Sequence, residues 1–392
     1  MRLYLTTLNP TDSVTGGFLP AAAALGWDVT ILTDQPDRYS GYDVVAADVR
    51  DPRAVIDAVA SHHRPDVIFS NSDHLQAATA LAAAYFGLPG KDWRACVTAK
   101  NKALTRRALA AVEPVRSVRL PPGGQVPEDL PYPVVVKPAL GVASEDVVLV
   151  DDRDALAAAV AEIRERRPEE VLVAEEFLDG PLRTLETLGD GDVRHVLGGF
   201  ATTLGPLPHF VEERLDWRPP DAGHLPHLSA ALDAAGIGFG VCHTEYAVTR
   251  DGPRVIEINY RLIGDNCDFL LADLLGVPLH QWILRVHAGE PLPVFDPDGL
   301  RAAYGAVVSL VAERSGTVTA APPDLHPADL SPPGTEDGVR LWHRALREIG
   351  DHVEVTGTNR DYLGLLRAVG PDRASVDTAI DTFRKEHPWV LA

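Results

Sequence analysis

The residues best suited to chemistry lie at positions 241–266, in the segment VCHTEYAVTRDGPRVIEINYRLIGDN. Two β-like runs flank an Asp-Gly pair, and this arrangement predicts a β-hairpin. Side chains alternate between the two faces of a strand, so Glu257 and Asn259 share one face, which Glu245 on the first run can also reach. Two carboxylates and an amide oxygen make an all-oxygen site of the kind that suits Mg²⁺ or Mn²⁺.

Apolar residues alternate with these polar positions. Ile256 and Ile258 are therefore expected to face the opposite way, into the protein. Arg261 follows two residues after the amide, where it can meet an anion that bridges such metals. An amphipathic hairpin with a solvated acidic face would explain an isolated Glu-x-Asn pair equally well. The longer pattern, which continues through Arg261 to Gly264-Asp265, favours the metal site.

Composition narrows the class of protein. At 392 residues, with 45% hydrophobic residues and a mean hydropathy of −0.03, the chain is typical of a globular protein with two or three domains. No apolar run approaches the ~20 residues that span a bilayer, and a net charge of −20 argues against nucleic acid or an anionic membrane as partner. The start reads as a strand rather than a leader, and Cys96, Cys242 and Cys267 lack C-x-x-C spacing, so we expect reduced thiols and a cytoplasmic location.

The first 90 residues alternate short apolar runs with Ala-rich stretches, which predicts a parallel sheet with crossover helices. The predicted strands are 2–8, 28–33, 43–47 and 66–71, and the predicted helices are 18–26, 51–62 and 74–86. The G-x-G-x-x-G fingerprint of dinucleotide-binding folds does not follow the first strand. The tetrapeptide NSDH at 71–74 ends the fourth strand, where we expect a helix N-cap or, second, the lining of a substrate crevice.

Basic residues mark two further segments. Lys100 and Lys102 open a predicted helix that runs to Ala110, and lysines at such a position are usually solvated. Lys137 ends the apolar run VVVK and is either snorkelling to solvent or functional. Residues 139–144, ALGVAS, form a loop of small residues, which lets backbone amides approach phosphate oxygens.

Two segments precede the hairpin. A strand over 170–177 runs into the turn LDG, which by itself predicts only a buried strand and its turn. Residues 205–220 are rich in charged, aromatic and proline residues and predict a long loop, an element that is often functional. Arg214 and Arg218 in this loop could bind a carboxylate bidentately, and His209 could orient an amine. Surface charge is the alternative for each of the three.

Five elements in this order resemble the ATP-grasp superfamily. They are Lys102, Lys137, the segment 175–180, Glu245 and the run Glu257-x-Asn259-x-Arg261. The resemblance implies an α/β (α+β) fold with an N-terminal parallel α/β domain at 1–112, a small ATP lid lobe at 113–181, a larger antiparallel catalytic lobe at 182–300 and a C-terminal lobe at 301–392. In the last lobe the pattern predicts strands 304–311, 339–345, 353–357 and 362–369, a proline-rich loop at 322–334 and a final helix through 385.

The resemblance also implies roles for single residues. Those expected to bind ATP are Lys102, Lys137, Ser144, Glu175, Glu176, Phe177, Leu178 and Glu186. Glu175 and Leu178 pair with adenine through their backbone in this scheme, and Glu186 replaces a ribose-binding glutamate whose usual position holds Leu182. The expected metal ligands are Glu245, Glu257 and Asn259, and the expected catalytic residue is Arg261. The expected substrate residues are His209, Arg214, Arg218, Gly264 and Asp265.

The implied activity is that of an ATP-dependent carboxylate–amine ligase, which forms an amide or peptide bond through an acyl phosphate and uses Mg²⁺ or Mn²⁺. The runs TLETLGD and PHFVE resemble L-amino-acid ligases and natural-product or siderophore ligases within that superfamily. Two alternatives stay open: a carboxylase subunit that uses bicarbonate with a biotin or purine amine, and a nucleotide-binding module without turnover. The oligomeric state stays open as well, with a homodimer as one option.

Overall fold

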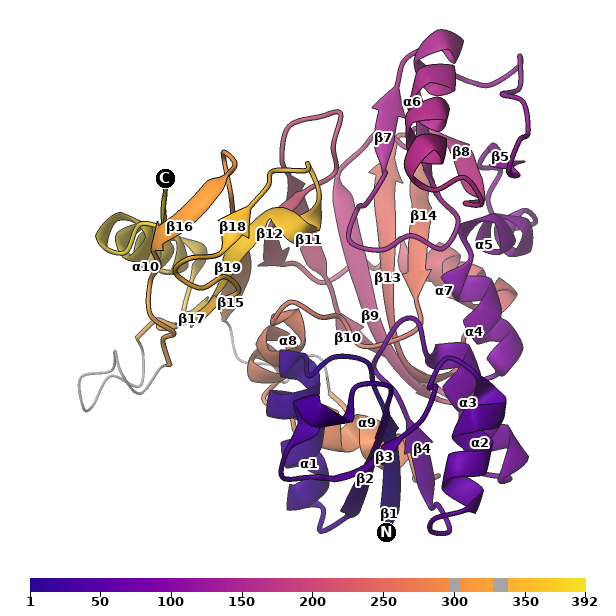
Figure 1. Cartoon of the computed structure of the whole chain (residues 1–392), viewed down its shortest axis with the longest axis vertical. Coiled ribbons are helices and arrows are strands. Elements are labelled where there is room, and N and C mark those ends of the chain that lie inside the picture. The colour runs from indigo at the N-terminus through magenta and orange to yellow at the C-terminus, as the bar shows by residue number, and fades with distance from the viewer. Residues whose placement is uncertain (297–302, 327–337) are drawn as a thin grey trace.

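The computed structural model of the protein describes residues 1–296, 303–326 and 338–392 (Figure 1). Its N-terminal part is a four-stranded parallel sheet in the order β3-β2-β1-β4, which confirms the predicted α/β class. The strands are β1 (Arg2–Thr6), β2 (Asp28–Thr33), β3 (Asp43–Ala46) and β4 (Val67–Phe69). The connecting helical elements are η1 (Ser13–Phe18), α1 (Leu19–Ala24), η2 (Pro36–Tyr39), α2 (Pro52–Ala60) and α3 (Gln76–Tyr85).

The helix predicted to open at Thr98 is in fact two helices, α4 (Trp93–Lys100) and α5 (Lys102–Leu109). The break falls at Asn101, whose backbone is extended and whose side chain accepts hydrogen bonds from the amides of Ala103 and Leu104. An asparagine that caps a helix in this way competes with helix continuation. Lys102 therefore stands in the first turn of α5 instead of inside a longer helix.

A small antiparallel sheet follows, in the order β5-β8-β6-β7. Its strands are β5 (Ser117–Leu120), β6 (Val134–Pro138), β7 (Val148–Val150) and β8 (Leu172–Glu176), and α6 (Arg153–Arg166) packs on it. Asp152 caps α6 by accepting a hydrogen bond from the amide of Ala155. Leu156, Val160 and Ile163 lie on the buried face of α6, because residues three and four apart share one side of a helix.

The largest sheet has nine strands in the order β14-β13-β9-β11-β12-β15-β19-β17, with β10 paired to β9. Its strands before residue 300 are β9 (Leu182–Asp190), β10 (Arg194–Gly198), β11 (Phe200–Leu204), β12 (Glu212–Trp217), β13 (Phe239–Thr249) and β14 (Gly252–Asn259). Strand β12 corrects the predicted loop at 205–220. Its residues, EERLDW, are mostly charged, yet the strand pairs with both β11 and β15, so backbone pairing overrides a polar sequence.

The C-terminal residues complete this sheet. Strands β15 (Tyr304–Val311), β17 (Arg340–Ala345) and β19 (Tyr362–Gly370) pair antiparallel, and α10 (Arg373–Glu386) packs against β15 and β19. A small sheet contains β16 (Gly316–Ala320), β18 (His352–Val353) and β20 (Val390–Leu391). The strand predicted at 353–357 is thus only two residues long, because the chain turns into η5 (Asn359–Asp361). Residues 327–334 of the predicted proline-rich loop lie outside the described residues.

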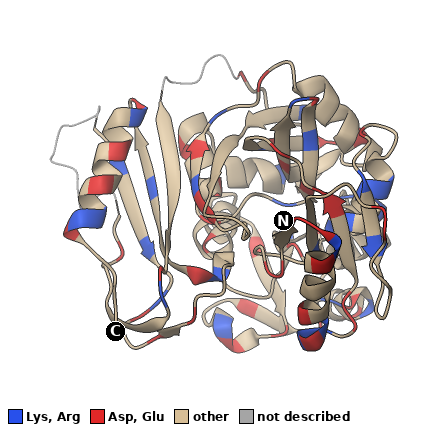
Figure 2. Ribbon diagram, turned by 90° about the horizontal axis from the view of Figure 1, so that it is seen from above, with Lys and Arg blue, Asp and Glu red and all other residues tan. Residues whose placement is uncertain are grey.

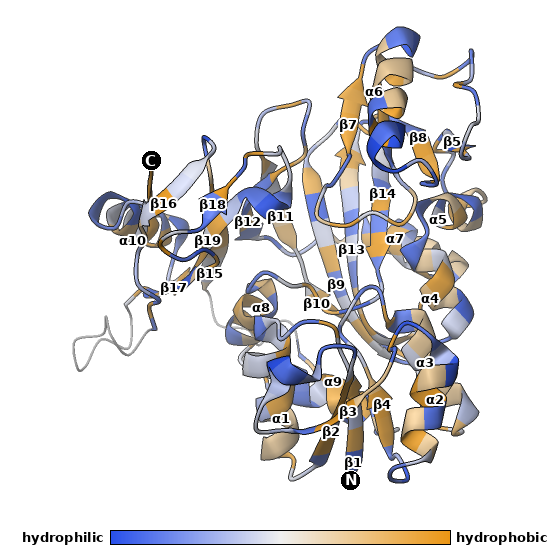
Figure 3. Ribbon diagram, viewed as in Figure 1, coloured by the Kyte–Doolittle hydropathy of each residue, from blue (hydrophilic) through white to orange (hydrophobic). Residues whose placement is uncertain are grey.

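Three helices pack against the large sheet: α7 (Leu225–Ala234), α8 (Cys267–Leu275) and α9 (Leu279–His287). Helices α8 and α9 share one hydrophobic core with the N-terminal sheet, so the two parts of the chain are held together by apolar packing. Hydrophobic residues concentrate in the strands of the N-terminal parallel sheet and of the small antiparallel sheet β5-β8-β6-β7 (Figure 3). Charged residues are frequent on the peripheral helices and loops and also occur on strands (Figure 2).

Among the described residues, no single helix is long and apolar enough to cross a membrane. The pair α8 and α9 meets the length and composition criteria together but is bent by 99°.

Candidate active site

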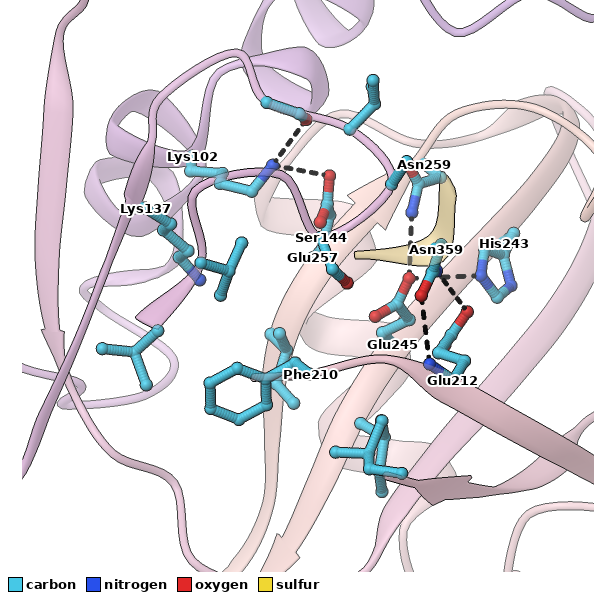
Figure 4. Close-up of a pocket in the computed structure, with 18 of the residues that line it drawn as sticks. Lys102, Lys137, Ser144, Phe210, Glu212, His243, Glu245, Glu257, Asn259 and Asn359 are labelled. Carbon is cyan, nitrogen blue, oxygen red and sulfur yellow. Dashed lines mark hydrogen bonds and ion pairs between the residues drawn. The ribbon is translucent and has the colours of Figure 1, made fainter. Parts of the chain in front are cut away.

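A cavity of about 960 Å³ lies between the small sheet, the large sheet and C-terminal residues 346–362 (Figure 4). Most of the predicted site residues line it: Lys102, Lys137, Ser144, Glu175, Glu176, Phe177, Leu178, Glu245, Glu257, Asn259, Arg261, Gly264 and Asp265. Four others are not among the lining residues: Glu186, His209, Arg214 and Arg218.

The β13–β14 hairpin carries the acidic end of the cavity. Glu245 pairs with Glu257, but the next residue, Tyr246, pairs with Val255, so Ile256 is the extra residue of a β-bulge. A bulge shifts the alternation of side chains by one position. The expectation that Ile256 faces inward with Ile258 is therefore wrong: Ile256 lines the cavity beside Glu257, whereas Val255 and Ile258 enter the core.

The oxygen donors of the hairpin fit a divalent cation that is bound together with a polyphosphate. Asn259 Nδ2 donates a hydrogen bond to Glu245 Oε1 over 3.3 Å, which leaves the amide oxygen of Asn259 for another ligand. No group of three or more His, Cys, Asp and Glu side chains in the described part of the chain is placed to hold a metal ion. Two carboxylates and one amide oxygen suit Mg²⁺, which takes the rest of its coordination shell from water and substrate phosphates.

Lys102 lies beside these donors, with 6% of its surface exposed. Its Nζ donates to Glu257 Oε1 over 2.8 Å and to the carbonyl of Gly141, in the loop after β6, over 3.0 Å. Burial alone lowers the pKa of Lys102, but the charge of Glu257 and its hydrogen bond outweigh burial and raise it. A charged ammonium group is therefore fixed between the hairpin and the β6–β7 loop (Figure 4).

Glu175, at the end of β8, joins two buried cations. Its Oε1 accepts from Arg106 Nε over 2.7 Å, and its Oε2 lies 2.6 Å from Lys137 Nζ. Burial raises the pKa of this carboxyl, but the charges and hydrogen bonds of Lys137 and Arg106 outweigh burial and bring it to about 2. Arg106 also contacts Glu113 and the carbonyl of Val255, so α5, β8 and the β13–β14 hairpin are linked through one side chain.

Apolar groups line the cavity at the end of the small sheet. Phe177 and Leu178 follow β8, and Phe210 lies opposite, with the two phenyl ring centres 6.4 Å apart. Val135 on β6 and Ile256 on β14 add further apolar surface. A flat apolar ring can be enclosed between such side chains.

Glu186 is not on the cavity wall, because it lies behind His243. The Glu186 carboxylate accepts from His243 Nδ1 over 2.7 Å, and Glu186 is fully buried. Burial lowers the pKa of His243, but Glu186 and Glu245 outweigh burial and raise it to about 10. The side chain that reaches the cavity at this point is thus a positively charged imidazolium, and the ribose contact predicted for Glu186 is not supported by its placement.

The three residues predicted to bind substrate from the 205–220 segment are placed elsewhere. Arg214 is on β12, where it pairs with Asp216 over 2.7 Å and with Asp377 of α10 over 2.5 Å. Arg218 follows β12 near Gly199, to whose carbonyl its amide donates. His209 packs against Gly357. Only Arg214 lies on β12, where it links the sheet to α10, and His209 and Arg218 lie outside that strand.

Arg261 is held by residues of the N-terminal part. Lys91 Nζ donates to the carbonyl of Tyr260 over 2.6 Å, and Asn71 Oδ1 accepts from the amide of Leu262 over 3.0 Å. The backbone is therefore fixed on both sides of Arg261. Asn71 belongs to the NSDH segment, and its contact with Leu262 was not predicted from the sequence.

The NSDH segment at 71–74 lines the cavity through Asp73, which pairs with Lys100, and through His74, in line with the second expectation for this segment. The first expectation, an N-cap, is wrong, because Leu75 precedes α3 and makes no side-chain cap.

Further lining residues were not named from the sequence. Glu212, Asn359 and Arg360 approach from β12 and from the chain before β19. Of these, only Glu212 had a signal, since it stands in the PHFVE run. The C-terminal contribution had none, because it depends on a contact between segments about 150 residues apart.

Comparison with known proteins supports the same fold. No protein-family model matches the chain. A protein of Sinorhizobium fredii (strain NBRC 101917 / NGR234) called uncharacterized protein y4rH is 29% identical over 418 residues, which cover all of this chain and 84% of that protein. A phosphoribosylamine–glycine ligase of Phenylobacterium zucineum is 25% identical over 329 residues, which cover 77% of this chain and 67% of that enzyme.

Solved structures resemble the whole chain. An L-amino acid ligase from Bacillus licheniformis superimposes with a TM-score of 0.81 at 22% identity, over 100% of this chain and 98% of that one. A phosphoribosylglycinamide synthetase from Anaerococcus prevotii gives a TM-score of 0.72 at 15% identity, over 100% and 99% of the two chains. These structural neighbours are ATP-grasp ligases. The chain has the ATP-grasp fold, as the sequence resemblance predicts.

Proposed function

We propose that the protein is an ATP-dependent carboxylate–amine ligase that activates a carboxylic acid as an acyl phosphate and joins it to an amine. The observation that carries this proposal is the convergence, in one cavity, of buried lysines, hard oxygen donors and an arginine. The L-amino acid ligase among the structural neighbours supports an amino acid or similar small acid as substrate. We further propose that the domain boundaries are those expected from the sequence, 1–112, 113–181, 182–300 and 301–392.

In this proposal ATP lies along β6 and the end of β8. Phe177, Leu178 and Ile256 enclose the adenine, and Lys137 and Lys102 contact the phosphates. Glu245, Glu257 and Asn259 hold Mg²⁺, which neutralises phosphate charge when it is bound. Glu175 does not contact nucleotide through its side chain, because it holds Lys137 and Arg106 in place.

Two bond exchanges make up the reaction. An oxygen of the substrate carboxylate attacks the γ-phosphorus of ATP, and the bond from that phosphorus to the bridging oxygen breaks, which releases ADP. The amine nitrogen then attacks the acyl carbon, loses a proton, and the carbon–oxygen bond to phosphate breaks. Arg261 stabilises the negative charge that develops on the oxygens in both exchanges, and preorganised positive charge is the main contribution of a protein to such transfers. Gly264 and Asp265 stay proposed substrate contacts.

The test is a phosphate-release screen over pairs of amino acids and over polycarboxylates, with mass spectrometry of the products. Glu257→Gln keeps the shape of the side chain but removes one charge, so it should slow turnover by roughly 10²–10³ without unfolding the protein. Glu165→Gln, on the exposed side of α6, is the matched control. Wild-type turnover in a folded Glu257→Gln protein contradicts the metal assignment. Phosphate release that needs bicarbonate and no added acid points to a carboxylase instead.

A further inference from the structure

The loop between β6 and β7 has an unusual backbone. Ala143, Ser144 and Asp146 adopt positive φ angles of 56°, 55° and 57°, although none of them is glycine. Residues with a Cβ are disfavoured in this left-handed region, so they hold it only where surrounding contacts enforce it. Ala143 and Ser144 line the cavity, which makes those contacts important for the site.

Contacts that hold the loop come from the other side of the cavity. The amide of Asn359 donates to the carbonyl of Ala143 over 3.1 Å. Arg360 forms an ion pair with Glu145 through its Nε. Glu145 also pairs with Arg167, which belongs to the same small-sheet part of the chain as the loop itself. The loop is thus tied both within its own part and, through Asn359 and Arg360, to the C-terminal part.

Hydrogen bonds within the turn hold the segment that carries these two residues. The carboxylate of Asp361, which is 2% exposed, accepts hydrogen bonds from the amides of Thr356, Gly357 and Thr358. Thr358 and Asp361 form a capping box at the start of η5. Gly357 has φ +71°, and a Cβ there would lie 2.8 Å from the ring of His209. These contacts stabilise the conformation of the turn that places Asn359 and Arg360.

The same turn is bound to the acidic end of the cavity. Asn359 Oδ1 accepts from the amide of Glu212 over 3.0 Å, and its Nδ2 donates to Glu212 Oε2 over 3.3 Å. The hydroxyl of Tyr362 donates to the carbonyl of Glu212 over 2.7 Å. Figure 4 shows Asn359 beside Glu212 and Glu245. The segment 359–362 thus connects the acidic end of the cavity with the β6–β7 loop.

We propose that Asn359 and Arg360 are positioning residues that hold the β6–β7 loop against the nucleotide phosphates. The inference rests on the proposed nucleotide site and adds that the C-terminal part controls nucleotide affinity. It also explains how a loop of the sequence ALGVAS, with one glycine, keeps a backbone shape that glycines would otherwise supply. The ion pair between Arg360 and Glu145 contributes only modestly to holding the loop, because the Arg360 side chain is exposed to solvent.

The experiment compares Arg360→Ala and Asn359→Ala with Arg167→Ala. Asn359→Ala removes the side-chain bonds to Glu212 that place the backbone amide of Asn359. Arg167→Ala removes ion pairs to Glu145 and Asp146 within the small-sheet part, without touching the C-terminal part.

Affinity for the magnesium complex of a non-hydrolysable ATP analogue is measured by calorimetry. Cleavage after Glu145 by a glutamate-specific protease is mapped by mass spectrometry, and thermal melts confirm folding. We expect Arg360→Ala to weaken binding by about two- to fivefold and to speed cleavage, as the loss of one exposed ion pair implies. Arg360→Lys should restore part of both, and Arg167→Ala should leave the affinity unchanged.

Equal affinity and equal cleavage in wild type, Arg360→Ala and Asn359→Ala overturn the inference. The same is true if Arg167→Ala weakens binding as much as Arg360→Ala, because ion pairs within the small-sheet part then matter as much as the C-terminal contact. A wild-type protein that does not bind the analogue overturns the proposed nucleotide site itself, and so differs from a failure seen only in the variants.

Discussion

Replacement of Glu175 by glutamine removes the carboxylate that Arg106 and Lys137 share. The pKa of this carboxyl is about 2 in the folded protein, against an ordinary value of 4.5. A lowered pKa means that the ionised carboxylate stabilises the fold at pH above 4.5, and that this contribution is lost as the pH falls toward 2. At 1.36 kcal/mol for each pKa unit, the contribution at pH 7 is about 3 kcal/mol. At pH 3 the same linkage leaves only about 1 kcal/mol.

Glu175→Gln should therefore lower the free energy of unfolding at pH 7 by about 3 kcal/mol or somewhat more, because it also leaves Lys137 buried without its carboxylate partner. The assay is urea unfolding followed by tryptophan fluorescence at pH 7, 4 and 3. The gap between variant and wild type should narrow steadily as the pH falls. Glu176→Gln, at the neighbouring and more exposed residue, serves as the control.

A second change separates charge from packing. The double variant Glu175→Gln/Lys137→Met also removes the ammonium group of Lys137, which the single variant leaves unpaired, while Arg106 keeps Glu113 as its partner. The double variant should be more stable than Glu175→Gln alone, since replacing both partners of a buried pair costs less than removing one. Equal stability of wild type and Glu175→Gln at pH 7, or a gap that does not change with pH, refutes this reasoning.

Two further predictions concern residues whose roles the structure redefines. Arg214→Lys keeps the charge but loses the planar guanidinium that contacts Asp216 and Asp377. The variant should therefore have a lower melting temperature and unchanged Michaelis constants. A raised Michaelis constant would indicate that Arg214 binds substrate after all. Lys91→Met removes the hydrogen-bond donor to the carbonyl of Tyr260, the residue before Arg261. Turnover should fall by about tenfold or more because Arg261 is misplaced, while nucleotide affinity measured by calorimetry stays the same. Unchanged turnover would show that Lys91 does not position Arg261.

The order of local patterns along the chain was enough to predict the fold. The parallel strands of the N-terminal sheet and the β13–β14 hairpin follow from hydrophobic runs and an Asp-Gly turn, and both are present. The pairing of Glu245 with Glu257 does not follow, because a hairpin without the bulge would pair Glu245 with Ile256. Local rules therefore predict many of the elements that form, but not every pairing within them.

Long-range contacts were beyond such rules. The bulge at Ile256 depends on how β13 pairs across the turn, and the hairpin pattern contains no mark of it. Strand β12 forms because it pairs with β11 and β15 on either side, and its charged sequence does not predict a strand. Arg106 and Asn359 act through partners 69 and 147 residues away. Their types were visible in the sequence, but their neighbours were not.

Transfer of oxygen from the acid to phosphate tests the central claim most directly. Once the screen identifies an acid that supports phosphate release, that acid is supplied with ¹⁸O in its carboxylate, together with ATP, Mg²⁺ and the amine. If the carboxylate attacks the γ-phosphorus, the released phosphate carries one ¹⁸O atom per amide formed, and mass spectrometry of the phosphate detects it. Amide formation with unlabelled phosphate, or with release of pyrophosphate, would contradict the acyl-phosphate route and the ligase function proposed for this cavity.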